Sequence, residues 1–283
     1  MRWTPGGDSS DVEDRRDDGG SGGFQFGGMH LGIGGFIILL ILSFVFKRNF
    51  LTLLGTDGSS APTSAVSHDT PRDKAEQPLV DFVTFVLDDT QNTWQKILPA
   101  QGVPYHHAKL VLFRNAIDSA CGTAQSASGP FYCPQDEKVY IDLSFFDELR
   151  NRFGAPGQFA EAYVLAHELG HHVQKLLGIE AKVRAAQERN PQSARELSVR
   201  LELQADCFAG VWGNTTQQRN LFEPGEADEG LKAAAAVGDD RLQKMSSGRV
   251  NPETFTHGSS SQRMEWFQRG FKDGNISSCN TFN

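Results

Sequence analysis

Hydrophobic and polar positions along this chain follow patterns that predict a mainly helical domain with a small sheet. Residues 79–98 carry apolar side chains at helical spacing, which predicts a first long helix. Two shorter apolar runs, 109–113 and 138–143, are typical of β-strands, and an aromatic segment at 130–133 lies between them. This combination indicates the α+β class.

The carboxyl-terminal half continues the helical pattern. Residues 145–152 lead into a strongly apolar helix that Gly178 ends, because glycine is favoured just beyond a helix terminus. The pair Asn190–Pro191 marks the start of another helix, since asparagine caps a helix and proline suits its first turn. Two more helices are predicted over 229–242 and 262–271.

The amino-terminal quarter has a different composition. Residues 1–28 combine acidic side chains with a Gly-rich run and are predicted to be disordered. Residues 31–46 are uncharged and strongly apolar, about 24 Å long as a helix. With their flanks they predict one transmembrane helix over 29–54. A polar linker, 55–78, then precedes a domain that spans 79–283.

Two other interpretations of this apolar run stay open. A cleavable signal peptide starts near the amino terminus with a basic region, whereas this run begins about thirty residues in and follows an acidic stretch. A buried core helix is also apolar on all sides, but this run is isolated between a Gly-rich segment and a polar linker. We therefore expect an uncleaved single-pass anchor, with the lipid bilayer as a partner. Basic residues flank it at Arg15–Arg16 and Lys47–Arg48, so charge does not decide its orientation.

Composition limits the class of protein and its partners. The chain has 283 residues, of which 39% are hydrophobic and 22% charged, an ordinary balance for a globular domain. Its net charge of −8 argues against nucleic acid as a partner.

The four cysteines bear on the cellular compartment. They form no Cys-x-x-Cys pair, and the most local of the possible connectivities joins Cys121 to Cys133 and Cys207 to Cys279. If both bonds form, the domain lies in an oxidising compartment, either the periplasm or the cell exterior. The anchor would then cross the inner membrane with the amino terminus inside. Free buried thiols are the alternative.

The most informative chemical signal is the segment His167-Glu168-Leu169-Gly170-His171. Residues four apart lie on one face of a helix, so the two histidines can bind one metal ion. Glu168 then lies beside the metal, where its carboxylate can take a proton from an activated water and pass it to a leaving amine. A chance match on a solvated helix is the alternative. The surrounding apolar residues instead predict a buried helix, in which unpaired polar side chains are unfavourable.

A catalytic zinc site takes three protein ligands and keeps one position open, so a third ligand is expected downstream. Glu202 is the best candidate, because it lies on the helix that starts at Asn190–Pro191 and Asp206 shares its face. Asp206 would accept the second ring N–H of a ligand histidine, which we expect to be His167, and so fix its orientation. The alternative is an acidic surface on an amphipathic helix.

His257 is the histidine that follows the two ligand helices. It lies on a loop before the helix 262–271, which Ser259 or Ser260 caps. A histidine there can stabilise the oxyanion of a tetrahedral intermediate, or it can only cap the helix or hold the loop. Both interpretations stay open.

Three further histidines are expected to have no part in catalysis. His172 follows His171 directly and points about 100° away around the helix, so it is expected to pack or support rather than bind metal. His106 and His107 are expected on the surface.

These residues together resemble known peptidases. In the gluzincin class of zinc peptidases, a His-Glu-x-x-His helix is completed by a Glu from a later helix, and this Glu lies in a Glu-x-x-x-Asp motif. The residues Glu202 to Asp206 match that second motif. The segments 167–174, 203–212 and 256–260 more closely resemble the bacterial family called putative neutral zinc metallopeptidases. The resemblance also takes in the amino-terminal residues 1–3 and 12–16. It implies a Zn²⁺ cofactor and a protein or peptide substrate.

The sequence therefore predicts a membrane-anchored zinc endopeptidase with a mainly helical, zincin-like α+β domain. His167, His171 and Glu202 are the expected zinc ligands, and Glu168 is the expected general base and acid. Two other functions stay open. One is a zinc-stabilised binding or scaffold protein of the cell envelope without turnover, and the other is a hydrolase of a non-protein amide.

Overall fold

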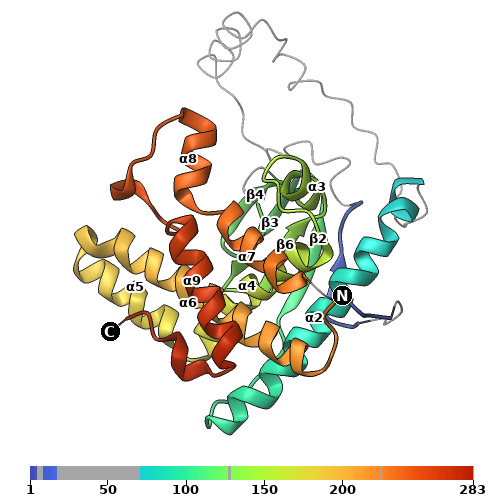
Figure 1. Cartoon of the computed structure of the whole chain (residues 1–283), viewed down its shortest axis with the longest axis horizontal. Coiled ribbons are helices and arrows are strands. Elements are labelled where there is room, and N and C mark those ends of the chain that lie inside the picture. The colour runs from blue at the N-terminus through green and yellow to red at the C-terminus, as the bar shows by residue number, and fades with distance from the viewer. Residues whose placement is uncertain (5–8, 18–70, 127–128, 224, 283) are drawn as a thin grey trace, which may run out of the picture. The chain divides into compact units, whose positions relative to one another are not determined.

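The computed structural model describes residues 1–4, 9–17, 71–126, 129–223 and 225–282 (Figure 1). The predicted transmembrane segment, 29–54, lies outside these residues, as does most of the predicted linker. Within the described ranges, no helix is both long and apolar enough to cross a membrane. The anchor therefore stays a prediction.

The longest described helices form the body of the fold. They are α2 (Pro71–Ala100), α4 (Gln158–Leu176), α6 (Ala194–Gln218) and α9 (Ser260–Asp273). The shorter helices are α3 (Ser144–Asn151), α5 (Ile179–Arg189), α7 (Glu226–Ala236) and α8 (Asp239–Ser247). The central helix α4 contacts α2, α6, α7 and the sheet, which explains why apolar residues occupy nearly all of its faces. Gly178 follows α4 with a positive φ of 68°, as expected of a glycine that ends a helix.

A small mixed sheet lies against these helices (Figure 1). Its strand order is β1-β2-β6-β5, with β1 (Val12–Asp14), β2 (Lys109–Phe113), β5 (Phe131–Cys133) and β6 (Lys138–Asp142). β1 and β2 are parallel, β2 and β6 are parallel, and β5 runs antiparallel to β6 as an edge strand. A separate hairpin joins β3 (Ala116–Ser119) to β4 (Gly122–Gln125). The α+β class and the strands β2 and β6 are as predicted.

The prediction of disorder for the amino-terminal segment is wrong for residues 1–4 and 9–17. Val12–Asp14 forms β1, and Trp3 packs against Phe82 of α2 with ring centroids 5.3 Å apart. The acidic composition concealed this, because β1 is stabilised by backbone pairing and ion pairs rather than by an apolar face. One of these pairs joins Glu13 to Lys138 of β6 at 2.7 Å.

Several element boundaries also differ from prediction. α2 begins at Pro71, within the predicted linker, and the β3–β4 hairpin was not predicted. The segment 229–242 divides into α7 and α8 at Gly238, where a Cβ would lie 2.3 Å from the backbone nitrogen of Ser260. A side chain is excluded there, because the chain before α9 passes too close. α6 starts at Ala194, after a short 3₁₀ turn at Pro191–Ser193.

Both predicted cysteine pairs are within bonding distance and form disulfides, Cys121–Cys133 and Cys207–Cys279. The first joins the turn of the β3–β4 hairpin to β5. The second holds the segment after α9 against α6, where the two helices approach so closely that a Cβ on Gly270 would lie 1.9 Å from the carbonyl oxygen of Cys207. Together they tie the β3–β4 hairpin to the sheet and the carboxyl-terminal segment to α6.

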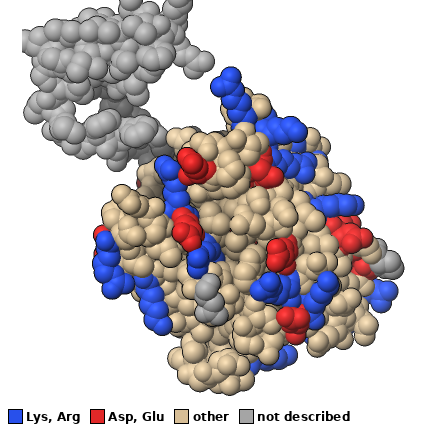
Figure 2. All heavy atoms as spheres, turned by 60° about the vertical axis from the view of Figure 1, so that its left-hand side comes forward, with Lys and Arg blue, Asp and Glu red and all other residues tan. Residues whose placement is uncertain are grey.

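The surface of the described unit is mixed in charge. On the face in Figure 2, Lys and Arg side chains are interspersed with Asp and Glu rather than gathered into a patch of one sign. Large hydrophobic side chains that are exposed in the described part of the chain are Met245, Val250 and Met264. The absence of a nucleic-acid partner stays a prediction from the net charge.

Candidate metal centre

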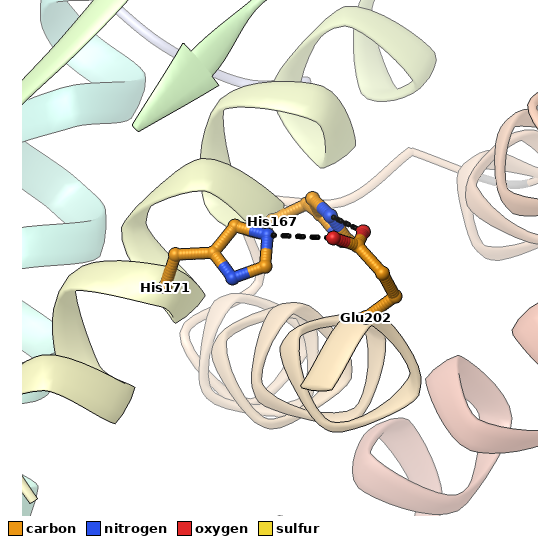
Figure 3. Close-up of side chains that lie close together, drawn as sticks. All are labelled: His167, His171 and Glu202. Carbon is orange, nitrogen blue, oxygen red and sulfur yellow. Dashed lines mark hydrogen bonds and ion pairs between the residues drawn. The ribbon is translucent and has the colours of Figure 1, made fainter. Parts of the chain in front are cut away.

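The centre forms where α4 and α6 cross. His167 and His171 lie one turn apart on α4 and face α6, which carries Glu202 (Figure 3). The two helices approach closely at Gly170, where a Cβ would lie 3.0 Å from the carbonyl oxygen of Ala205. A Cβ at position 170 would be in tight contact with the backbone of α6, so this glycine lets the helix that carries Glu202 approach both histidines closely.

The facing atoms of these three residues are donors of the kind that bind zinc. Glu202 Oε2 lies 3.1 Å from His167 Nε2, and Glu202 Oε1 lies 3.6 Å from His171 Nε2. One ligand atom from each residue lies within 4.8 Å of the others, and no other such group of His, Cys, Asp or Glu occurs among the described residues. Two imidazoles and one carboxylate fit a catalytic zinc ion with one position left open. Side chains of His171 and Glu202 stay 20% and 19% exposed, which leaves that position accessible.

Hydrogen bonds fix how both rings are oriented. His167 Nδ1–H donates to Asp206 Oδ1 at 2.9 Å, and His171 Nδ1–H donates to Gln174 Oε1 at 2.8 Å. Each histidine therefore turns its Nε2 toward Glu202. The placement of Asp206 against His167 is as predicted, whereas Gln174 was not singled out by the sequence.

Asp206 is the most heavily bonded carboxylate near the centre. It is fully buried and accepts two hydrogen bonds from Arg263 of α9, from Nε and Nη2, both at 2.8 Å. The hydroxyl of Tyr163, which also lies on α4, donates to the same carboxylate. Neither Arg263 nor Tyr163 was predicted as part of the centre. Arg263, Phe267 and Gly270 share the buried face of α9 at helical spacing, and an arginine on such a face indicates a buried carboxylate partner.

The electrostatics of the centre favour a cation. Burial raises the pKa of Glu202, but His171 and His167 outweigh it and hold the pKa well below its usual range. Burial likewise raises the pKa of Asp206, and Arg263 and His167 reverse this and lower it. For His167, burial lowers the pKa, but Asp206 and Glu202 outweigh burial and raise it to about 9. Both carboxylates are therefore ionised at neutral pH, and they attract positive charge to the position between the ring nitrogens.

A cavity of about 530 Å³ lies beside the centre and is lined by both histidines and Glu202. Glu168 and His257, the other predicted site residues, line the same cavity. His257 keeps 50% of its side chain exposed, and its Nδ1 lies 3.2 Å from Asp239 Oδ1. Asp239 also accepts the backbone N–H groups of Thr256, His257 and Gly258. This carboxylate therefore fixes both the His257 loop and the orientation of the His257 ring.

The other histidines lie where they were expected. His172 is buried behind the centre, where Tyr132 of β5 donates to its Nδ1 at 2.9 Å and its Nε2–H donates to the carbonyl of His106 at 2.7 Å. Burial lowers the pKa of His172 to about 4, so the ring is neutral and joins α4 to β5. His106 and His107 are exposed and pair with Glu137 and Asp11.

Comparison with known proteins adds the family. The model of the family described as "Putative neutral zinc metallopeptidase" matches residues 1–282. "Uncharacterized protein YpfJ" from Escherichia coli (strain K12) is 47% identical and covers 100% of this chain and 99% of its own length. "Uncharacterized protein Rv2575" from Mycobacterium tuberculosis is 44% identical and covers 67% of this chain and 66% of its own. No solved structure matches the chain. The family match takes in β1 as well as the metal centre.

Proposed function

This chain belongs to the family of putative neutral zinc metallopeptidases, and we propose that it is a zinc-dependent endopeptidase whose active site is the centre between α4 and α6. The observation that carries the proposal is the grouping of His167, His171 and Glu202, whose ligand atoms lie within 4.8 Å of one another. Glu168 lines the same cavity without belonging to this group. Three ligands with a separate carboxylate are the arrangement that hydrolysis requires.

Each residue then has one task. A zinc ion held by the three ligands supplies Lewis-acid polarisation of the scissile carbonyl and makes water more acidic. Glu168 accepts a proton from the attacking water and delivers it to the nitrogen of the leaving amine. Asp206 and Gln174 hold the ring N–H groups of His167 and His171, so that both Nε2 atoms stay directed at the ion.

We assign His257 to the oxyanion. Its Nδ1 is held by Asp239, so Nε2 is the ring nitrogen left to face a substrate in the cavity. The hydrogen bond that the ring donates to Asp239 outweighs the effect of burial and raises the pKa of His257, which favours the charged donor. A charged N–H aimed at the developing oxyanion stabilises the transition state more than the substrate.

We also assign the backbone of β5 to substrate binding. β5 is the edge strand beside the centre, and no strand pairs with its outer edge among the residues that the structure describes. Phe131 and Tyr132 of β5 line the cavity. An extended peptide can pair with such an edge through main-chain hydrogen bonds, independent of its side chains. Endopeptidase activity on unfolded or extended chains is therefore the expected reaction.

The first test is metal content together with cleavage of a generic substrate such as casein. The full-length chain should bind one zinc ion, and His167→Ala and Glu202→Ala should each lose both zinc and cleavage, because two ligands hold the ion poorly. Glu196→Ala is the matched control, since Glu196 is an exposed carboxylate on the same helix that pairs only with Arg200 in its neighbourhood. A folded wild-type chain without zinc would overturn the proposal. Zinc binding without any cleavage would favour the alternative function, a zinc-stabilised binding or scaffold protein without turnover.

The second prediction concerns His257→Ala. This change should lower kcat by about 10²–10³-fold, the loss seen when one oxyanion donor is removed, and should leave zinc content unchanged. The measurement is kcat and KM on a fluorogenic peptide, with His106→Ala, an exposed histidine outside the cavity, as the control. Wild-type kcat in His257→Ala would restrict His257 to holding its loop.

A further inference from the structure

Residues that lie far apart in the sequence, at the end of the amino-terminal segment and at the start of α2, share one ion-pair partner. Arg114, which directly follows β2, pairs with Asp17 at 3.2 Å and with Asp73 of α2 at 2.7 Å. Arg16 pairs with Glu76 of α2 at 2.9 Å. One cluster of charges therefore holds both ends of the 18–70 segment.

This cluster is part of the folded interior. The side chains of Arg16 and Asp73 are 1% and 2% exposed. Charged groups buried to this degree are strongly unfavourable without their partners. Separating residues 1–17 from α2 would leave Asp73 with only one of its arginines nearby and would expose Arg16, so the cluster forms only when both segments are together.

The amino-terminal segment is also joined to the sheet and to the apolar core. β1 pairs with β2 in register, Val12 opposite Leu110 and Asp14 opposite Leu112. Met1 is buried, and Trp3 packs on Phe82. These contacts involve residues 1–4 and 9–17 and reach α2, β2 and β6, so these residues are an integral part of the domain.

A membrane-spanning segment between these two parts creates a conflict. One crossing by 29–54 would place residues 1–17 and 71–282 on opposite sides of the bilayer, and β1 could not pair with β2. Two crossings need about 20 apolar residues each, and the apolar run 31–46 is shorter than that. The fold and the single-pass topology that the sequence predicts are therefore incompatible.

We propose that residues 1–4 and 9–17 lie on the same side of any membrane as the domain that begins at Pro71, contrary to the single-pass topology that the sequence predicts for 29–54. The disulfides Cys121–Cys133 and Cys207–Cys279 place the domain in an oxidising compartment, and pairing with β2 takes the amino terminus there with it. This replaces the expected orientation with the amino terminus inside.

The test uses the full-length chain with one free thiol at a time. All four cysteines are in disulfides, so Ser10→Cys and Ser246→Cys each introduce one reactive group at an exposed site, before and after the 18–70 segment. Spheroplasts that express each variant are treated with a membrane-impermeant maleimide, and labelling is compared with that after detergent lysis. The wild-type chain, which should not label, is the control.

Labelling of both variants before lysis, to the level reached after it, is the expected result. Labelling of one variant before lysis and of the other only afterwards would overturn the proposal. Protection of both until lysis would support the common side but overturn its assignment to the oxidising compartment. Arg2→Cys and Lys272→Cys, at two other exposed positions, repeat the comparison in case one substitution disturbs the fold. None of these results depends on whether the protein cleaves peptides.

Discussion

Replacing Glu168 by glutamine is expected to lower the rate of peptide hydrolysis by about 10²–10⁴-fold, the contribution of a positioned general base and acid. Glutamine keeps the length of the side chain but cannot take a proton from water at neutral pH. Because Glu168 is not one of the three grouped metal ligands, zinc content should stay at the wild-type level. The measurements are kcat/KM on a peptide substrate and metal analysis of the same preparation.

Glu188→Gln is the matched control, since it makes the same chemical change at an exposed position on α5. It should leave both readings unchanged. Wild-type cleavage by Glu168→Gln would show that another group activates the water. Loss of zinc together with activity would show instead that Glu168 contributes to metal binding, which its position in the sequence argues against.

The grouping of His167, His171 and Glu202 could be predicted because the geometry of each pattern is local within its helix. The spacing of His167 and His171 fixes their common face, and the spacing of Glu202 and Asp206 fixes theirs. The sequence does not determine how α4 and α6 cross. In the structure the two helices approach closely at Gly170, and this crossing brings the two patterns together. Two short-range patterns and one close helix contact therefore account for most of the centre.

The residues that were missed depend on contacts between distant segments. Arg263 reaches Asp206 from α9, a separation of 57 residues, and nothing near Arg263 in sequence indicates its partner. β1 was missed for a related reason: its Val-Glu-Asp sequence has low strand propensity, and it forms because β2 offers an edge and Arg114 and Lys138 offer opposite charges. The same long-range pairing shows that a catalytic fragment without β1 would lack part of the fold.

Asp206 connects the fold to the candidate metal centre, because its carboxylate accepts hydrogen bonds from the buried guanidinium of Arg263 and from the ring of His167. Arg263 is only 4% exposed, and both oxygens of Asp206 accept hydrogen bonds from it. Such a buried ion pair adds little to the free energy of unfolding when it is compared with an apolar replacement of both residues. Loss of one partner is much more destabilising, because it leaves an uncompensated buried charge. The change at Asp206 should therefore affect folding more than the change of any ligand.

Asp206→Asn is expected to lower the free energy of unfolding by about 3–5 kcal/mol and the affinity for zinc by about 10–100-fold. Thermal unfolding and zinc titration against a competing chelator measure the two effects, with Asp228→Asn, an exposed carboxylate on α7, as the control. The double variant Asp206→Asn/Arg263→Met removes the unpaired cation, so it should recover much of the stability. Zinc affinity should remain low in the double variant, because His167 Nδ1–H still lacks an anionic acceptor. Recovery of both quantities would show that Asp206 only balances Arg263 and does not act on the metal through His167.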